Sequence, residues 1–342
     1  MGNTISTFMG TGSKGYTGDV GFAQDEKLND PFHVDLDPTE KILYVADCFN
    51  FRIRSVDITT GKTKNFAGNG IQGHTGDGGL ATEASIDEIY AIQADINGDV
   101  YICQRFNPCI RKISSETGII SSIAGTGKPG SGPDNIKAVE SPLMEPNDCF
   151  LDGRGGLLIA DIKDQKVRKV DLNNGIISTF AGTGAKEHTG DGEPASQAGI
   201  FGARAVCVDD SGNTYICERE GNTIRKVNTE GIITKIAGTG EKGYTGDGGP
   251  ALKATFNGPK AIRCTKDGNL LVVDTENHAI RIIDMTSLHI YTIAGGTIGP
   301  HGDSKKATEA GLSRPHGVVT SSTGMMYIAD SENHRIRIVK LG

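Results

Sequence analysis

Short runs of alternating apolar and polar residues recur along the whole chain and predict β-strands. One example is Ile-Ile-Thr-Lys-Ile-Ala at 232–237, because alternation with a period of two gives a strand one buried face. An apolar run with a central arginine occurs six times, as RIRSV (52–56), CIRKI (109–113), KVRKV (166–170), TIRKV (223–227), AIRII (279–283) and RIRIV (335–339). Written in register, each repeat contains four short strands separated by turns rich in Gly and Asn. The pattern predicts an all-β, repetitive protein.

Glycine-rich hexamers accompany the strands. The stretch GTGEKG at 238–243 matches the Gly-x-Gly-x-x-Gly pattern of dinucleotide sites, which has a function only where it joins a strand to a helix. The residues that follow contain too many Gly and Pro to begin a stable helix, and similar hexamers start at Gly10, Gly68 and Gly125. We interpret them as turns in a repeat of about 57 residues, and we predict no nucleotide cofactor.

Six four-stranded units predict a six-bladed β-propeller, because radial repetition buries both faces of each antiparallel blade against its neighbours. The chain ends on the third strand of a unit and begins with a lone strand of the fourth type, so we expect the N-terminal strand to join the last blade and close the ring. We predict a single domain over 1–342. Its units lie at approximately 5–62, 63–119, 120–176, 177–232, 233–289 and 290–342.

Several segments resemble the NHL repeat family in its bacterial form. They are YIADSENHRIRIV (327–339), VVDTENHAIRII (272–283) and GYTGDGGPA (243–251). The resemblance covers essentially the entire chain and implies the same six-bladed fold. Propellers of this kind range from protein and RNA binders to enzymes, and their fold relatives include peptidylglycine amidating lyase, gluconolactonase-like and strictosidine synthase-like propellers. The resemblance therefore indicates an architecture without choosing an activity.

Residues present in every repeat most simply serve the blade. The shared arginines are Arg54, Arg111, Arg168, Arg225, Arg281 and Arg337, and the shared loop aspartates are Asp19, Asp77, Asp191, Asp247 and Asp303. We expect each arginine to form a bidentate ion pair with a carboxylate, which would stabilise a turn-rich blade edge. These residues are interpreted as structural.

One pair of positions differs between repeats and lies where a propeller opens its central channel. The pairs are Phe32-His33, Tyr90-Ala91, Asn147-Asp148, Arg204-Ala205, Lys260-Ala261 and His316-Gly317. A scaffold alone has little need for imidazoles, a carboxylate, a phenol, a guanidinium and an amine around one axis. We predict that this mouth is the ligand site.

Three functions compete for this site. A divalent metal (zinc, iron or calcium) could be held by His33, Asp148 and His316, as the resemblance to the amidating lyase, with its zinc-bound histidines, implies. Alternatively, His33, Tyr90 or His316 could act as acid or base while Phe32, Asn147, Arg204 and Lys260 bind the substrate, giving a lyase or hydrolase of a small anionic molecule. A non-catalytic scaffold for a peptide or protein partner is the third. We favour the enzyme.

Net charge and cysteine content argue against some binding partners and some cellular locations. The net charge of −7 gives no basic footprint for nucleic acid. Seven cysteines without a Cys-x-x-Cys pair, and no signal peptide or membrane-spanning run, predict a reducing, cytoplasmic location and no membrane contact. The N-terminal MGNTIS matches a myristoylation pattern, but a strand expected directly after Gly2 argues against the lipid.

Overall fold

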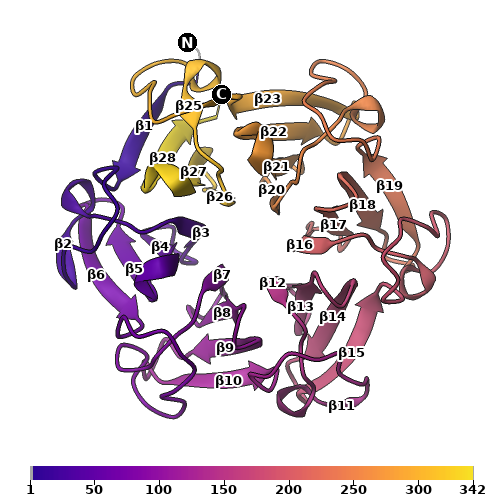
Figure 1. Ribbon diagram of the computed structural model, residues 1–342, viewed down its shortest axis with the longest axis horizontal. Coiled ribbons are helices and arrows are strands. Elements are labelled where there is room, and N and C mark those ends of the chain that lie inside the picture. Colours follow the sequence, from indigo (N-terminus) through magenta and orange to yellow (C-terminus); the bar gives the residue numbers. More distant parts are fainter. Residues whose placement is uncertain (1–2, 342) are drawn as a thin grey trace.

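The computed structural model describes residues 3–341, in which six four- or five-stranded β-sheets are arranged as blades around a central axis (Figure 1). Gly2, on which the myristoylation pattern falls, lies outside the described residues. The prediction of a six-bladed propeller is confirmed. Within the described part of the chain, no helix has the length and hydropathy needed to cross a membrane.

Each blade is an antiparallel sheet whose first strand lies nearest the axis (Figure 1). Blade 1 contains β3 (Pro31–Leu36), β4 (Ile42–Asp47), β5 (Arg52–Asp57) and β6 (Lys62–Ala67), with β2 (Val20–Phe22) added at its outer edge. Blade 2 contains β7 (Ile89–Ala94), β8 (Val100–Gln104), β9 (Cys109–Ile113) and β10 (Ile120–Ala124). Blade 3 contains β12 (Pro146–Leu151), β13 (Gly156–Asp161), β14 (Lys166–Asp171) and β15 (Ile176–Ala181), with β11 (Ile136–Lys137) at its edge.

The second half of the ring repeats this arrangement. Blade 4 contains β16 (Ala203–Val208), β17 (Thr214–Glu218), β18 (Thr223–Val227) and β19 (Ile233–Ala237). Blade 5 contains β20 (Ala261–Cys264), β21 (Leu270–Asp274), β22 (Ala279–Asp284) and β23 (His289–Gly295). Blade 6 contains β26 (Gly317–Thr320), β27 (Met325–Asp330), β28 (Arg335–Lys340) and β1 (Ile5–Met9), and β24 (Thr297–Ile298) pairs in parallel with β25 (Gly311–Leu312) beside it.

Short 3-10 helices occupy the loops. They are η1 (Ala23–Asp25), η2 (Cys48–Asn50), η3 (Ala138–Glu140), η4 (Ala195–Gln197), η5 (Ala251–Lys253), η6 (Thr275–Asn277), η7 (Ala307–Glu309) and η8 (Ser331–Asn333). The helices η2, η6 and η8 directly follow the second strand of their blades. They therefore lie at the mouth of the channel, where the turn after that strand meets the start of the innermost strand.

The N-terminal strand closes the ring, as the sequence predicted. β1 pairs antiparallel with β28, with Ile5 opposite Val339 and Met9 opposite Ile336, and Figure 1 shows the two ends of the chain meeting in this blade. Ile5 and Met9 are fully buried. Consequently a sequence unit does not coincide with a blade. Each unit contributes the outer strand of one sheet and the inner three strands of the next.

The hydrophobic core lies between the blades. Each of six clusters combines buried side chains from two neighbouring sheets, for example Val34 and Val45 of blade 1 with Tyr327 and Ile336 of blade 6. Both faces of a blade are therefore apolar along the inner strands, and burial of this area is the main driving force for ring closure.

The six shared arginines are buried, at most 1% exposed, and every one contacts a carboxylate. The pairs are Arg54–Glu26 (2.9 Å), Arg111–Asp77 (2.5 Å), Arg168–Asp134 (2.8 Å), Arg225–Asp191 (2.9 Å), Arg281–Asp247 (2.8 Å) and Arg337–Asp303 (2.7 Å). Two details differ from expectation. Asp19 lies 3.6 Å from Arg52 instead of pairing with Arg54, and Asp134 takes the loop position in blade 3.

The arginine contacts are also not bidentate pairs with one carboxylate. One nitrogen of Arg281 contacts Asp247, and the other lies 3.5 Å from the buried Asp274 and donates to the carbonyl oxygen of Thr255 at 2.8 Å. The guanidinium of Arg281 therefore ties a loop to the third strand and to the end of the second strand, which a pair with a single carboxylate could not do.

Candidate functional site

The varied position of the repeat is a β-bulge at the start of the innermost strand. In blades 1 to 4, pairing with the second strand skips one residue, and the skipped residues are Phe32, Tyr90, Asn147 and Arg204. In blades 5 and 6 the equivalent Lys260 and His316 directly precede β20 and β26. A bulge residue leaves the pleat of the sheet and can be aimed elsewhere, so these six side chains, here called the ring residues, are free to turn toward the channel mouth.

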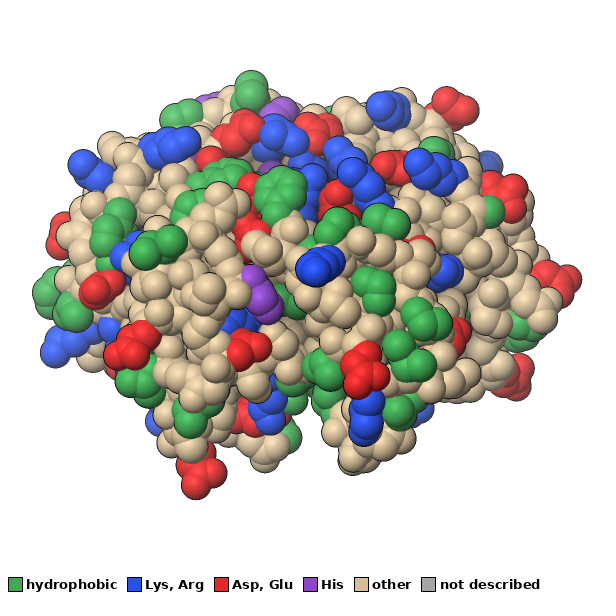
Figure 2. All heavy atoms as spheres, turned by 60° about the horizontal axis from the view of Figure 1, so that its bottom comes forward, with side chains coloured by type: hydrophobic (Ala, Val, Ile, Leu, Met, Phe, Trp, Pro, Cys, Tyr) green, Lys and Arg blue, Asp and Glu red, His purple; other side chains and the backbone are tan. Residues whose placement is uncertain are grey.

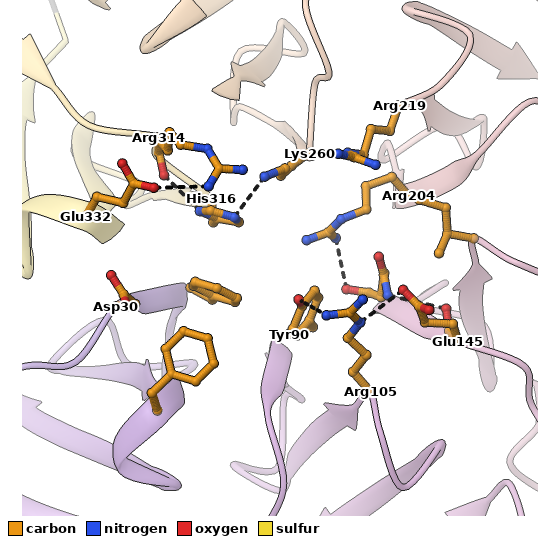
Figure 3. A pocket seen from close by; sticks show the side chains of 14 residues that line it. Asp30, Tyr90, Arg105, Glu145, Arg204, Arg219, Lys260, Arg314, His316 and Glu332 are labelled. Carbon is orange, nitrogen blue, oxygen red and sulfur yellow. Dashed lines mark hydrogen bonds and ion pairs between the residues drawn. The ribbon is translucent and has the colours of Figure 1, made fainter. Parts of the chain in front are cut away.

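All six ring residues line one cavity of about 350 Å³ on the axis (Figure 3). The remaining lining comes from the loops before the innermost strands and from the turns after the second strands. These residues are Asp30, Phe49, Arg105, Glu145, Ile162, Arg219, Arg314 and Glu332. The structure thus brings together Phe32, Tyr90, Asn147, Arg204, Lys260 and His316, six of the eight side chains proposed from the sequence.

The other two, His33 and Asp148, do not line the cavity but meet at Arg263. The Arg263 guanidinium contacts both carboxylate oxygens of Asp148 at 3.0 Å and lies 2.6 Å from Nε2 of His33. All three side chains are buried. Burial and the Arg263 charge hold the pKa of His33 well below its usual range, so this imidazole is neutral.

This arrangement does not fit the metal site considered from the sequence. A guanidinium stands between His33 and Asp148, while His316 contacts Lys260 instead. Among residues 3–341, no three His, Cys, Asp or Glu side chains are grouped so that they could hold a metal ion. Metal binding therefore stays a prediction, and no step below passes through a metal.

One side of the cavity is aromatic. The rings of Phe32 and His316 stack with centroids 4.2 Å apart and planes 6° from parallel. Phe32 also meets Phe49 and Tyr90 edge to face, at 5.5 and 5.1 Å. Tyr90 receives a hydrogen bond from Arg105 at 2.8 Å, and burial raises the pKa of Tyr90 to about 12. At neutral pH this phenol is protonated, which favours a role in packing and hydrogen bonding over a role as a base.

The part of the cavity wall around Arg204 and Arg219 is cationic. Arg204 is 4% exposed; its guanidinium donates to the backbone carbonyl of Asn147 at 3.1 Å and lies 5.1 Å from the Tyr90 ring centroid. Within the described chain, no carboxylate lies within ion-pair distance of Arg204 or Arg219, and Nε of Arg219 is buried without a hydrogen-bond partner. Burial lowers the pKa of Arg204 from its usual value. A buried cation without a partner favours binding of an anion.

Lys260 and His316 form a hydrogen-bonded pair at the cavity wall. Nδ1 of His316 lies 2.8 Å from the carbonyl oxygen of Arg314, to which it can only donate, so Nε2 carries the lone pair and accepts from Nζ of Lys260 at 3.0 Å. Burial, together with the charges of Lys260 and Arg204, holds the pKa of His316 well below its usual range. Burial is also the main cause that lowers the pKa of Lys260 to about 7, against the opposing effect of Glu276.

Sequence reasoning missed the loop residues of the cavity. Arg105, Ile162 and Arg219 occupy one register position, directly after the residue that ends the second strand, where the other blades have Cys48, Thr275 and Ser331. The ring residues were found because they differ between repeats. The same comparison, applied to the position after the second strand, would have indicated Arg105 and Arg219. Asp30, Glu145 and Arg314 likewise share the position two residues before the ring residue.

The fold and the axial cavity define a six-bladed β-propeller with a polar central pocket, and comparison with known proteins refines this class. The model of the NHL repeat matches residues 312–339. Human NHL repeat-containing protein 2 is 25% identical over 293 residues, covering 77% of this chain and 40% of the relative. The chain therefore carries an NHL repeat, and it spans well under half the length of this relative.

Solved structures share the fold at low sequence identity. An auxiliary nutrient binding protein from Bacteroides thetaiotaomicron superimposes with a TM-score of 0.70 at 17% identity, covering 98% of this chain and 76% of that one. Virginiamycin B lyase from Staphylococcus aureus superimposes with a TM-score of 0.55 at 15% identity, covering 94% and 98%. Related propellers thus include a binding protein and a lyase, and similarity at this level shows the fold alone.

Proposed function

We propose that the axial pocket binds a small molecule with an anionic group and catalyses a lyase or hydrolase reaction on it. The observation that carries the proposal is the buried Arg204, which has no carboxylate partner and faces the cavity beside Arg219 and Lys260. An incoming carboxylate or phosphate would supply the missing counter-charge. In a site this buried, such a charge-assisted contact contributes about 1.5–3 kcal/mol.

The aromatic side indicates the remainder of the ligand. Tyr90 lies between Arg204 and Phe32, with its ring centroid 5.1 Å from each, and Phe32 and Phe49 lie beyond it. Planar apolar groups pack well against such aromatic surfaces. We therefore expect a ligand whose anion and whose ring or other flat apolar part lie on opposite sides of one small molecule.

Proton transfer would fall to His316. Its Nδ1 proton is fixed by the Arg314 carbonyl, and stacking on Phe32 fixes the ring plane, so the Nε2 lone pair keeps one direction toward the cavity wall. A neutral, oriented imidazole can take a proton from a bound substrate and return it to a leaving group.

Binding is tested with 4-hydroxybenzoate and phenyl phosphate as probes and benzyl alcohol as the uncharged control. We expect both anions to raise the melting temperature and Arg204→Met to weaken their binding at least about tenfold. Arg154→Met, which removes an exposed arginine elsewhere in the chain, is the matched control and should bind like the wild type. Equal binding to both variants, or no binding of either anion, would contradict the proposal.

Chemistry is tested separately with mono-4-nitrophenyl succinate, an anionic ester. We expect His316→Gln to lower kcat/KM at least about 100-fold while 4-hydroxybenzoate still binds. A reaction rate equal to that of the wild type would remove His316 from the mechanism.

The alternative is a non-catalytic scaffold whose pocket receives an acidic group of a peptide or protein partner. Two ion pairs near the cavity favour this alternative. Arg314 with Glu332 and Lys163 with Glu145 are partly exposed, and binding of a small ligand does not require these additional charges. This function predicts that an acidic peptide binds more tightly than 4-hydroxybenzoate, and that His316→Gln changes neither affinity.

A further inference from the structure

Lys260 occupies an unusual place for a lysine. As the ring residue of blade 5 it is 6% exposed and lines the cavity. Figure 3 shows its amine directed toward His316, with Arg204 and Arg219 on its other side. Nζ lies 3.0 Å from Nε2 of His316 and 3.3 Å from a carboxylate oxygen of Glu276.

The carboxylate near this amine is already engaged. Both oxygens of Glu276 accept hydrogen bonds from Arg314 at 2.9 Å, so the contact with Lys260 is the longer and weaker one. Besides Glu276, the charges that act on this amine include those of Arg204, Arg219 and Arg314. Burial and neighbouring cations both favour the uncharged amine.

Three other lysines with an ion-pair partner differ from Lys260. Lys163 is 65% exposed and contacts Glu145 at 3.0 Å. Lys169 contacts Asp152 at 2.7 Å, and Lys112 contacts Asp99 at 2.5 Å. These amines have a close carboxylate and access to solvent, whereas the amine of Lys260 is buried and its contact with Glu276 is longer.

We propose that Lys260 is a nucleophile that forms an imine with the carbonyl group of a 2-oxo carboxylic acid. This inference rests on the proposed function, because the same pocket binds the acid: Arg204 holds the carboxylate, and the aromatic side packs against the rest of the molecule. The carbonyl carbon next to the carboxylate then faces the amine of Lys260, the ring residue that follows Arg204.

The reaction is balanced without an oxidant or reductant. The Nζ lone pair forms a bond to the carbonyl carbon, and the carbonyl π pair moves to oxygen. Nε2 of His316 takes one proton from nitrogen and passes it to this oxygen, which gives a carbinolamine. The hydroxyl oxygen then takes a second proton from solvent, the nitrogen lone pair forms the carbon–nitrogen double bond as the carbon–oxygen bond breaks, and water departs, leaving a protonated imine. The protonated imine withdraws electrons from the neighbouring carbon and so promotes the bond cleavage that a lyase performs.

The experiment incubates the whole protein with phenylpyruvate and sodium cyanoborohydride, which reduces an imine to a stable amine, and locates the adduct by mass spectrometry of peptides. We expect the adduct on Lys260 in at least tenfold excess over Lys163. Lys260→Arg should abolish it, while the matched Lys163→Arg leaves it unchanged. Melting temperatures of both variants show that they fold.

A second arm uses phenylacetone, the ketone without the carboxylate. We expect at least tenfold slower trapping of this probe, and a similar loss for phenylpyruvate in Arg204→Met. Adducts spread evenly over exposed lysines, or an adduct that persists in Lys260→Arg, would overturn the inference. If phenylpyruvate raises the melting temperature but leaves no adduct on Lys260, the inference fails and the binding proposal stands; if neither phenylpyruvate nor 4-hydroxybenzoate binds, both fail.

Discussion

Two groups of buried arginines in this propeller, the repeated arginines of the third strands and Arg204 at the axis, differ in their partners. The six repeated arginines at the third strands each contact a carboxylate and loop carbonyls, whereas Arg204 at the axis contacts a carbonyl and a ring face and no carboxylate of the described chain. The same residue type thus stabilises the fold where it is repeated and paired, and is available to a ligand where it is unique and unpaired. The difference teaches that divergence from the repeat, more than charge itself, marks the candidate site.

The surface supports the same distinction. On the face shown in Figure 2, basic and acidic side chains are interspersed, as expected for charges that mainly keep the protein in solution. The cavity differs in composition, since five of its lining residues are Arg or Lys and three are Asp or Glu. Local excess of positive charge therefore occurs in a chain whose net charge is −7.

The largest effect that would test the comparison is expected for Arg281→Met. It leaves the fully buried Asp274 without its cation and the Thr255 carbonyl without its donor, which should lower the free energy of unfolding by about 3–5 kcal/mol. Arg204→Met, at the axis, should lower it by less than about 1 kcal/mol, because no ion pair is broken. Urea unfolding of both variants measures the difference, and equal losses would break the comparison.

A somewhat smaller effect is expected for Arg263→Met, which belongs to neither region. It leaves Asp148 buried with only the backbone N–H groups of Cys149 and Val206 as partners, so we expect a loss of about 3 kcal/mol. Because Arg263 lies below the cavity and does not line it, the affinity for 4-hydroxybenzoate in the folded variant should change less than about threefold. Loss of binding at unchanged stability would move Arg263 into the site.

Lys260→Met should raise stability, and by an amount that depends on pH. The folded-state pKa of Lys260 is lowered to about 7, against about 10.4 in an unfolded chain. Between these values the unfolded state binds more protons, so wild-type stability rises as pH increases from about 7 to about 10. The substitution should therefore stabilise by up to about 4 kcal/mol at pH 6 and by much less at pH 10. A gain that does not depend on pH would show that packing, and not the amine charge, is responsible.

The smallest effect concerns the aspartate that deviates from the repeat. Asp19 is 64% exposed and lies 3.6 Å from Arg52, so Asp19→Asn should change the free energy of unfolding by less than about 0.5 kcal/mol. Asp303→Asn removes the 2.7 Å partner of the fully buried Arg337 and should cost more, about 1–2 kcal/mol. Thermal unfolding of the two variants side by side distinguishes an aspartate that pairs with a fully buried arginine from one that does not.

Much of the fold could be predicted because it is repeated. Six copies of one apolar pattern fix the number of blades, and the unmatched first strand indicates how the ring closes. The ring residues were also found from the sequence, since they are the positions at which otherwise similar repeats differ. The sequence did not indicate that Glu26 replaces Asp19 as the partner of Arg54, because Glu26 stands in a loop outside the aligned motif.

The contacts across the channel could not be predicted from the repeat. Arg263 reaches from blade 5 to His33 of blade 1 and Asp148 of blade 3, and strand alternation gives no information about which distant blade a side chain meets. For the same reason the sequence grouped His33 and Asp148 with His316, although the bulge turns only the first residue of each pair into the cavity and leaves the second in the strand.

Closure of the last sheet by β1 has a consequence for folding during synthesis. Among the strands of the propeller, β1 is synthesised before the others and its partner β28 after them, so the edge that β28 presents is absent while the other five blades are being built. During that interval Ile5 and Met9 have no permanent place to be buried, and the exposed strand is a site where chaperones or unwanted neighbours could pair with the nascent chain. Slow translation of the propeller should therefore prolong vulnerability to aggregation at β1 more than at β28.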